Sequence, residues 1–174
     1  MLRSSSLRCA IGRSLVLGAL LGLLATGSAY AQTSDKFEIS KYGGRIGFSQ
    51  NPDQFTIGAY AQLGEIAPHL SMRPSGDLGW GDHVFTIVGN ADLQYSFIVG
   101  SSVAPFVGAG LGVIHASFDL PPGAVGDDSS THVGLNVYGG AEMDLGGYKS
   151  GFVEARVGID ELPDFKLTIG LGFY

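Results

Sequence analysis

The sequence predicts an all-β protein, an eight-stranded antiparallel up-and-down transmembrane β-barrel. Three observations lead to this fold class. Apolar and polar residues alternate with a period of two in one stretch after another, which is the pattern of strands with one apolar face. No helical period appears after residue 31, where strands instead recur at regular spacing. Glycine has 24 of its 28 copies after residue 31, and it gathers on the strand face that also carries the charges.

The first 31 residues are predicted to be a cleaved signal peptide. Three arginines precede a short apolar run at 15–24, and this run is shorter than the roughly 20 residues that a membrane-spanning helix needs. Ala29-Tyr30-Ala31 forms a small-x-small cleavage site. We therefore expect two parts, the signal peptide at 1–31 and a single outer-membrane barrel domain at 32–174.

The composition after residue 31 excludes several functional classes. The one cysteine, Cys9, lies in the signal peptide, so disulfides, thiolate metal sites and cysteine nucleophiles are not expected. Seven basic and sixteen acidic residues give this part a net charge of −9, with His counted as neutral. Nucleic acid is not an expected partner, because phosphate binding depends on clustered Lys and Arg. No metal ion or cofactor is predicted.

Eight strands are expected in chain order. The clean alternations lie at 55–63, 133–145, 151–159 and 165–174, where the apolar face includes Val137, Leu167 and Ile169. Less regular strands are expected at 42–49, 66–73, 84–98 and 104–118. Turn-like sequences separate them, among them 51–53, 74–77, 100–102, 121–130, 146–147 and 162–164.

The polar face is predicted to line the lumen. It carries rows of glycine, such as Gly108, Gly110 and Gly112, which would destabilise an exposed strand but make room inside a narrow barrel. It also carries charges that would be costly in lipid but can pair across a lumen. The predicted lumen network, taken as structural, consists of Arg45, Asp92, Tyr138, Glu142, Glu154, Arg156 and Lys166.

An even number of strands puts both termini on one side, expected to be the periplasm. The stretches near 74–82 and 119–131 are then outer loops two and three, and those near 100–103 and 146–148 are periplasmic turns. Centring the last of these on Gly147 places Tyr138 opposite Arg156. Aromatic residues near the strand ends are candidates for membrane-interface girdles: Tyr42, Phe55, Phe97, Phe106, Phe118, Tyr148, Phe165 and Phe173.

Four segments resemble the small outer-membrane β-barrel family that includes the OmpA transmembrane domain, OmpX and the opacity-type porin-like proteins. They are Ala104-Pro105-Phe106-Val107-Gly108-Ala109-Gly110-Leu111-Gly112, Phe152-Val153-Glu154-Ala155-Arg156, Asn90-Ala91-Asp92-Leu93-Gln94-Tyr95 and Gly170-Leu171-Gly172-Phe173-Tyr174. The resemblance covers essentially all of 36–174. It implies a bacterial outer-membrane location, reached by export through the inner membrane. It also implies a C-terminal signal, Phe173 and Tyr174, that the barrel assembly machinery reads, although many members end in Phe.

Such barrels serve many functions, so the resemblance predicts architecture better than activity. We expect a monomeric cell-envelope protein that is not an enzyme and has a structural or surface-interaction role. Its expected partners are outer-membrane lipid and lipopolysaccharide. The acidic loop at 119–131, with Asp119, Asp127 and Asp128, suggests weak binding of a divalent cation, but a merely solvated loop explains it more simply.

Three alternatives stay open. A lipid A-modifying enzyme would need a nucleophile beside a base, and the candidate groups are His69 with Ser71, His115 with Ser117, and His132 beside Thr131. A narrow pore would need an open lumen, whereas Tyr60, Tyr138 and Phe152 are expected to block it. A soluble lipocalin-like barrel would turn its apolar face inward, which leaves few charges to keep its surface in water.

Overall fold

The computed structural model describes residues 38–97, 102–118, 129–160 and 162–174. The predicted signal peptide and its cleavage site lie outside these residues, as does most of the acidic loop at 119–131. The strands are β1 (Ile39–Gln50), β2 (Gln54–Leu63), β3 (Glu65–Ala67), β4 (Leu70–Gly81), β5 (Val84–Ser96), β6 (Val103–Phe118), β7 (Ser129–Asp144), β8 (Lys149–Ile159) and β9 (Phe165–Phe173). No helix in the described part of the chain is long and apolar enough to cross a bilayer.

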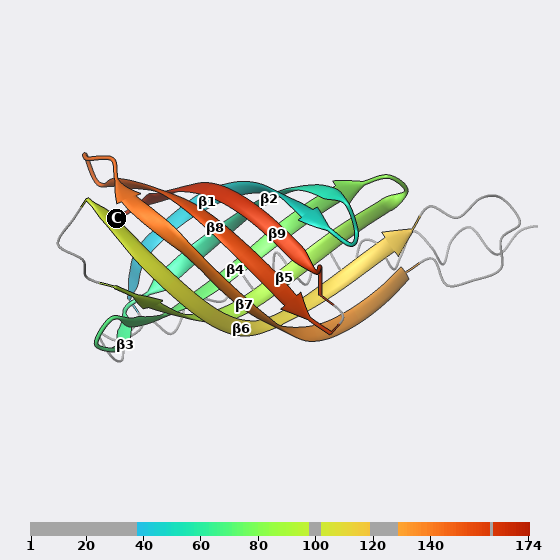
Figure 1. Cartoon of the computed structure of the whole chain (residues 1–174), viewed down its shortest axis with the longest axis horizontal. Helices are drawn as coiled ribbons and strands as arrows, with labels where there is room; N and C mark the ends of the chain where they lie inside the picture. Colours follow the sequence, from blue (N-terminus) through green and yellow to red (C-terminus); the bar gives the residue numbers. More distant parts are fainter. Residues whose placement is uncertain (1–37, 98–101, 119–128, 161) are drawn as a thin grey trace, which may run out of the picture. The chain divides into compact units, whose positions relative to one another are not determined.

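The strands form one antiparallel sheet that closes on itself (Figure 1). β1 pairs with β2 and with β9, each strand from β3 to β8 pairs with the next one in the chain, and pairing of β2 with β4 completes the circle. The short β3 follows β2 after Gly64 and also pairs with β4, so β2 and β3 together occupy one position. The described residues thus form the predicted eight-stranded up-and-down barrel, and closure gives every strand a partner on both sides.

The two ends of the barrel differ in what they carry. The terminal end, on the left in Figure 1, holds the start of β1, the end of β9 and the turns at 68–69 and 145–148. The opposite end, called here the loop end, holds the turns at 51–53, 82–83 and 160–164. The predicted register between β7 and β8 is confirmed, because Tyr138 pairs with Arg156 and Gly140 with Glu154.

Two expectations about the third barrel strand were wrong. The segment 74–77 is not a turn but the middle of β4, and the chain instead turns at Pro68 and His69, inside the strand expected at 66–73. The loop-end connection after it is the short turn at Asp82 and His83, not a loop over 74–82. Pro74 is tolerated because the β2–β4 ladder covers β4 only from Ser75 onward, where Ser75 pairs with Tyr60, and so leaves Pro74 out.

The faces of the sheet are inverted relative to a soluble barrel. Ile169 is 52% exposed on the outside, whereas Glu154 is 1% exposed inside, and β9 shows the same contrast between exposed Leu167 and buried Lys166. This arrangement confirms the predicted orientation, with apolar side chains toward lipid and charged ones toward the lumen. Phe106 is the exception among the proposed girdle aromatics. It is 3% exposed within the lumen, because it shares the inward face of β6 with Gly108 and Gly110.

Candidate functional site: the lumen

Three arginines converge on Glu154 of β8 at the centre of the lumen. Arg73 Nη1 donates to Glu154 Oε2 at 2.6 Å, and Arg156 Nη2 donates to Oε1 at 3.1 Å. Arg45 Nη1 lies 3.8 Å from the same Oε1. Arg73 is on β4, which is not a neighbour of β8 in the sheet, so this ion pair crosses the lumen and ties opposite walls together.

Asp77 of β4 forms the second centre of the cluster. Arg45 of β1 binds it in a bidentate manner, with Nε donating to Oδ1 at 2.8 Å and Nη2 to Oδ2 at 2.6 Å. Lys166 of β9 places Nζ 2.7 Å from Oδ2. All three residues are buried, so their charges are satisfied by one another instead of by bulk water.

Arg156 links the cluster to β5 and β7. Its Nη2 donates to Asp92 Oδ2 at 2.8 Å, and its Nη1 donates to Asn136 Oδ1 at 2.9 Å. Asn136 in turn donates to Asn90 Oδ1 at 3.4 Å. The network therefore engages strands all around the barrel and resists any change in their relative register.

Glycines on the inward face leave the space that these long side chains use. A Cβ at Gly108 would collide with the Tyr138 ring, and one at Gly110 would collide with the Asp92 carboxylate and the β5 backbone. Gly89, on the outward face of β5, has no atom near its missing Cβ. Larger residues are thus sterically excluded at the inward glycines but not at Gly89.

An aromatic layer fills the lumen between the ion cluster and the terminal end. It is formed by Tyr60, Phe106, Tyr138 and Phe152, all buried. The rings of Tyr60 and Phe152 meet edge to face at 5.3 Å between centroids. Arg73 covers this layer, with its guanidinium 4.5 Å from the Tyr60 ring centre. The space between Tyr60, Phe106 and Phe152 has no room for a water molecule, so these rings fill this section of the lumen.

The terminal end of the lumen carries a separate ion pair. Lys41 of β1 pairs with Glu142 of β7, and the Tyr174 hydroxyl donates to the same carboxylate at 3.1 Å. Lys41 Nζ also lies 4.6 Å from the centre of the Tyr174 ring. Phe173 faces outward beside Tyr42, with ring centroids 6.1 Å apart. The role of Phe173 and Tyr174 in assembly stays a prediction.

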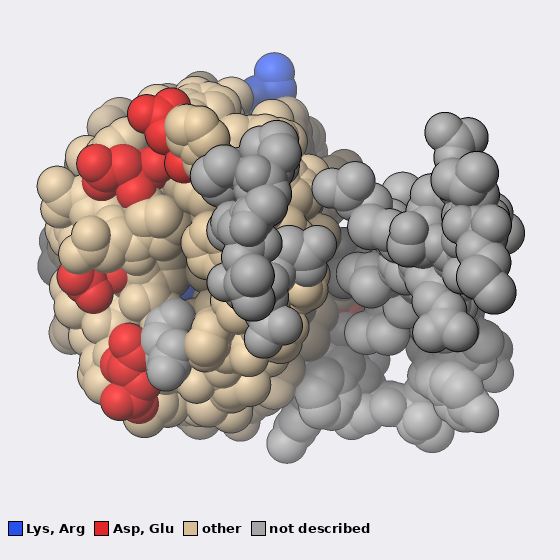
Figure 2. All heavy atoms as spheres, turned by 90° about the vertical axis from the view of Figure 1, so that its right-hand side faces the viewer, with Lys and Arg blue, Asp and Glu red and all other residues tan. Residues whose placement is uncertain are grey.

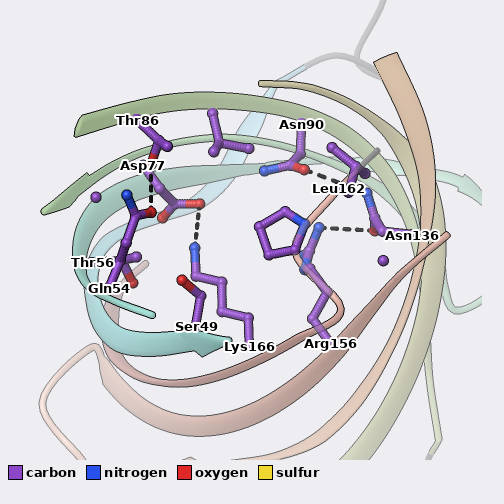
Figure 3. A pocket seen from close by; sticks show the side chains of 14 residues that line it. Ser49, Gln54, Thr56, Asp77, Thr86, Asn90, Asn136, Arg156, Leu162 and Lys166 are labelled. Carbon is purple, nitrogen blue, oxygen red and sulfur yellow. Dashed lines mark hydrogen bonds and ion pairs between the residues drawn. The ribbon is translucent and has the colours of Figure 1, made fainter. Parts of the chain in front are cut away.

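A cavity of about 30 Å³ lies in the loop-end half of the lumen (Figure 3). Its walls include Thr56, Asn90, Arg156 and Lys166. Leu162, from the turn between β8 and β9, is buried and also lines it. The Leu162 side chain occupies the space that Cβ atoms would need at three glycines of successive strands, Gly112, Gly134 and Gly158.

The structure places all seven residues of the predicted lumen network inside the barrel, and it adds three charged residues that the sequence reasoning missed, Lys41, Arg73 and Asp77. Arg73 and Asp77 were missed because 74–77 has the composition of a turn. A signal was present, since Ser71, Arg73, Ser75 and Asp77 alternate with apolar residues or glycine. Leu162 was assigned to a turn, and no sequence pattern marked it as buried.

Two of the candidate histidines, His69 and His115, have neighbours other than the serines with which the sequence paired them. His69 lies in a turn with φ of 64°, its ring 6.2 Å from that of Tyr95, whereas Ser71 is buried and accepts a hydrogen bond from Gln62 at 2.9 Å. His115 is hydrogen bonded to Thr131 on the outer face at 2.8 Å. The described residues contain no group of three or more His, Cys, Asp or Glu side chains that could hold a metal ion.

No protein-family model and no curated protein sequence matches this chain. Among solved structures, it is similar to the N-terminal β-barrel domain of Pseudomonas aeruginosa OprF, with 14% identity and a TM-score of 0.62, over 78% of this chain and 97% of that one. It is also similar to Neisserial surface protein A, with 17% identity and a TM-score of 0.58, over 76% and 94% of the two chains. A de novo designed transmembrane β-barrel matches at 12% identity and a TM-score of 0.55. These likenesses show a shared fold, that of the small transmembrane β-barrels, which the sequence resemblance implied.

Proposed function

We propose that this chain is an integral protein of a bacterial outer membrane with a structural or surface-interaction role. In this role the closed barrel is a rigid support in the bilayer, and the loop end is the part that meets the surroundings. The observation that carries the proposal is the filled lumen, in which an ion-pair cluster and an aromatic layer occupy the space that a pore would need.

The lipid-facing surface supports the membrane location. Described outward side chains along the middle of the strands are apolar or glycine, and an aromatic row formed by Phe48, Phe55, Trp80 and Phe85 runs across four adjacent strand positions near the loop end. OprF and Neisserial surface protein A, which share the fold, are bacterial proteins.

We expect the protein in the outer-membrane fraction of expressing cells, with different gel mobility before and after boiling. Recovery from the soluble fraction, with one mobility, would contradict this location.

The aromatic layer is the feature that distinguishes a structural barrel from a pore, and conductance measurements test it. In planar bilayers we expect no steady conductance from the unaltered protein. The triple variant Tyr60→Ala, Phe106→Ala, Phe152→Ala should conduct, because it removes three of the four rings that close the lumen. Phe48→Ala, which changes an outward aromatic residue, is the control and should show no steady conductance. Large steady currents from the unaltered barrel would favour the pore.

The rim of the loop end carries exposed carboxylates. Acidic residues gather along the left side of this rim in Figure 2, and those described are Asp53, Asp82, Asp160 and Asp164. The described residues there include no Lys or Arg outside the lumen. Contact with lipopolysaccharide phosphates through this rim would therefore need bridging divalent cations. Replacing the four Asp residues by Asn should change cation-dependent surface binding or envelope integrity, and unchanged cells would count against a surface role.

A further inference from the structure

The charges inside the described barrel do not balance. Five cations face four carboxylates in the lumen: Lys41, Arg45, Arg73, Arg156 and Lys166 against Asp77, Asp92, Glu142 and Glu154. Lys41 and Glu142 pair with each other at the terminal end. The excess therefore falls on the central cluster, which has four cations and three carboxylates. An unbalanced buried charge is costly, so a counter-ion at this place would stabilise the fold.

The cavity at the loop end lies beside this excess charge. Lys166 points into it from β9, and Arg156 borders it from β8 (Figure 3). Within the described part of the chain, Lys166 Nζ has one anionic partner, Asp77 Oδ2, although an ammonium group has three N–H donors. Thr56 of β2 also lines the cavity. Lys166 thus has N–H donors to spare beside a space that a hydroxyl-bearing residue borders.

We propose that the cavity binds one small monovalent anion, for which chloride is the natural probe, held by Lys166 and the Thr56 hydroxyl. The one carboxylate in the wall, Asp77, already accepts hydrogen bonds from Arg45 on both oxygens, so a cation would find no free ligand there. Water would fill the space but would leave the extra positive charge uncompensated.

The cavity volume limits the ligand class. A single water needs about 10–15 Å³ on this measure, so about 30 Å³ accommodates one or two water-sized particles. A phosphate or a lipid headgroup is too large. Leu162 lines the cavity, and the acidic rim outside repels anions. Refolding in the presence of the ion therefore gives it the surest access to the site.

Bromide replaces chloride in such sites and is located by its anomalous scattering. We expect one strong bromide peak in crystals of protein refolded in sodium bromide, within hydrogen-bonding distance of Lys166 Nζ. The peak should be lost in Lys166→Met and kept in Lys149→Met, which removes an exposed lysine outside the lumen. A cavity that holds only water in the unaltered protein, or a peak that survives in Lys166→Met, would overturn the proposal.

A second measurement covers the case in which Lys166→Met does not fold. The unaltered protein should unfold at a higher urea concentration after refolding in sodium chloride than in sodium gluconate of equal ionic strength. Thr56→Val, a change of similar size, should reduce this shift. Equal midpoints in the two salts for the unaltered protein would refute anion binding, whatever the variants do.

Discussion

Glu154 is the carboxylate on which three arginines converge, so Glu154→Gln is a sharp test of the cluster. The side chain is almost completely buried and lies within ion-pair distance of Arg45, Arg73 and Arg156. Glutamine keeps its shape but removes its charge. The central cluster would then hold four cations against two carboxylates, Asp77 and Asp92.

The expected loss follows from the cost of an uncompensated buried charge. Removing one partner of a buried ion pair costs about 3–5 kcal/mol. The glutamine oxygen still accepts one hydrogen bond, which returns about 1 kcal/mol. We therefore expect Glu154→Gln to lower the free energy of unfolding by about 3 kcal/mol, roughly a hundredfold in the folding equilibrium.

The assay is reversible urea unfolding in lipid vesicles, followed by the fluorescence of Trp80, the one tryptophan of the sequence. Trp80 lies on the outward face and leaves the bilayer on unfolding. Glu65→Gln, an exposed carboxylate on β3, is the matched control and should change stability by less than about 0.5 kcal/mol. If Glu154→Gln were as mild as this control, the buried ion pairs would contribute little, and the reasoning about the lumen would be wrong.

Two further predictions concern the two faces of the sheet. Gly108→Val should cost about 1–3 kcal/mol, since its side chain meets the Tyr138 ring, whereas Gly89→Val faces open space and should cost nothing; urea unfolding of both variants compares them, and equal losses would contradict the steric account. Ile169→Arg, in the middle of β9, should cost about 2–4 kcal/mol, and Ile159→Arg, at the end of β8, should cost about 0–1 kcal/mol. Unfolding from vesicles measures this depth dependence, and similar costs at both positions would place the lipid boundary elsewhere.

The outer face could be predicted from the sequence because lipid makes the same demand at every outward position. Val137 and Leu167 need only be apolar, so a period of two reveals them without knowledge of their neighbours. The register of the last strands followed from the same pattern together with a short turn. Phe106 shows where this reasoning failed: its position near a strand end suggested a girdle, although its parity with Gly108 placed it inside.

The segment 74–77 was wrongly predicted as a turn because its composition was given more weight than its period-two pattern. Pro74-Ser75-Gly76-Asp77 has four residues that favour turns, and this concealed a strand that runs through them. Proline lacks an N–H donor, but Pro74 lies where the ladder to β2 has ended, so the sheet loses no bond on that side. A turn-like composition therefore predicts a turn only where the period-two pattern is also interrupted. Arg73 and Asp77 continue that pattern through 74–77, so the segment is a strand.

The partners within the lumen could not be predicted, because they depend on where the closed sheet brings its walls together. Arg73 and Glu154 are 81 residues apart on strands that do not pair, and they meet only because the barrel is narrow. Leu162 is a stronger case, since it occupies space left by glycines on three strands. Alternation identifies which side chains point inward, whereas their pairing requires the closed geometry. For this reason the excess charge of the central cluster, and the counter-ion proposed to balance it, became visible only in three dimensions.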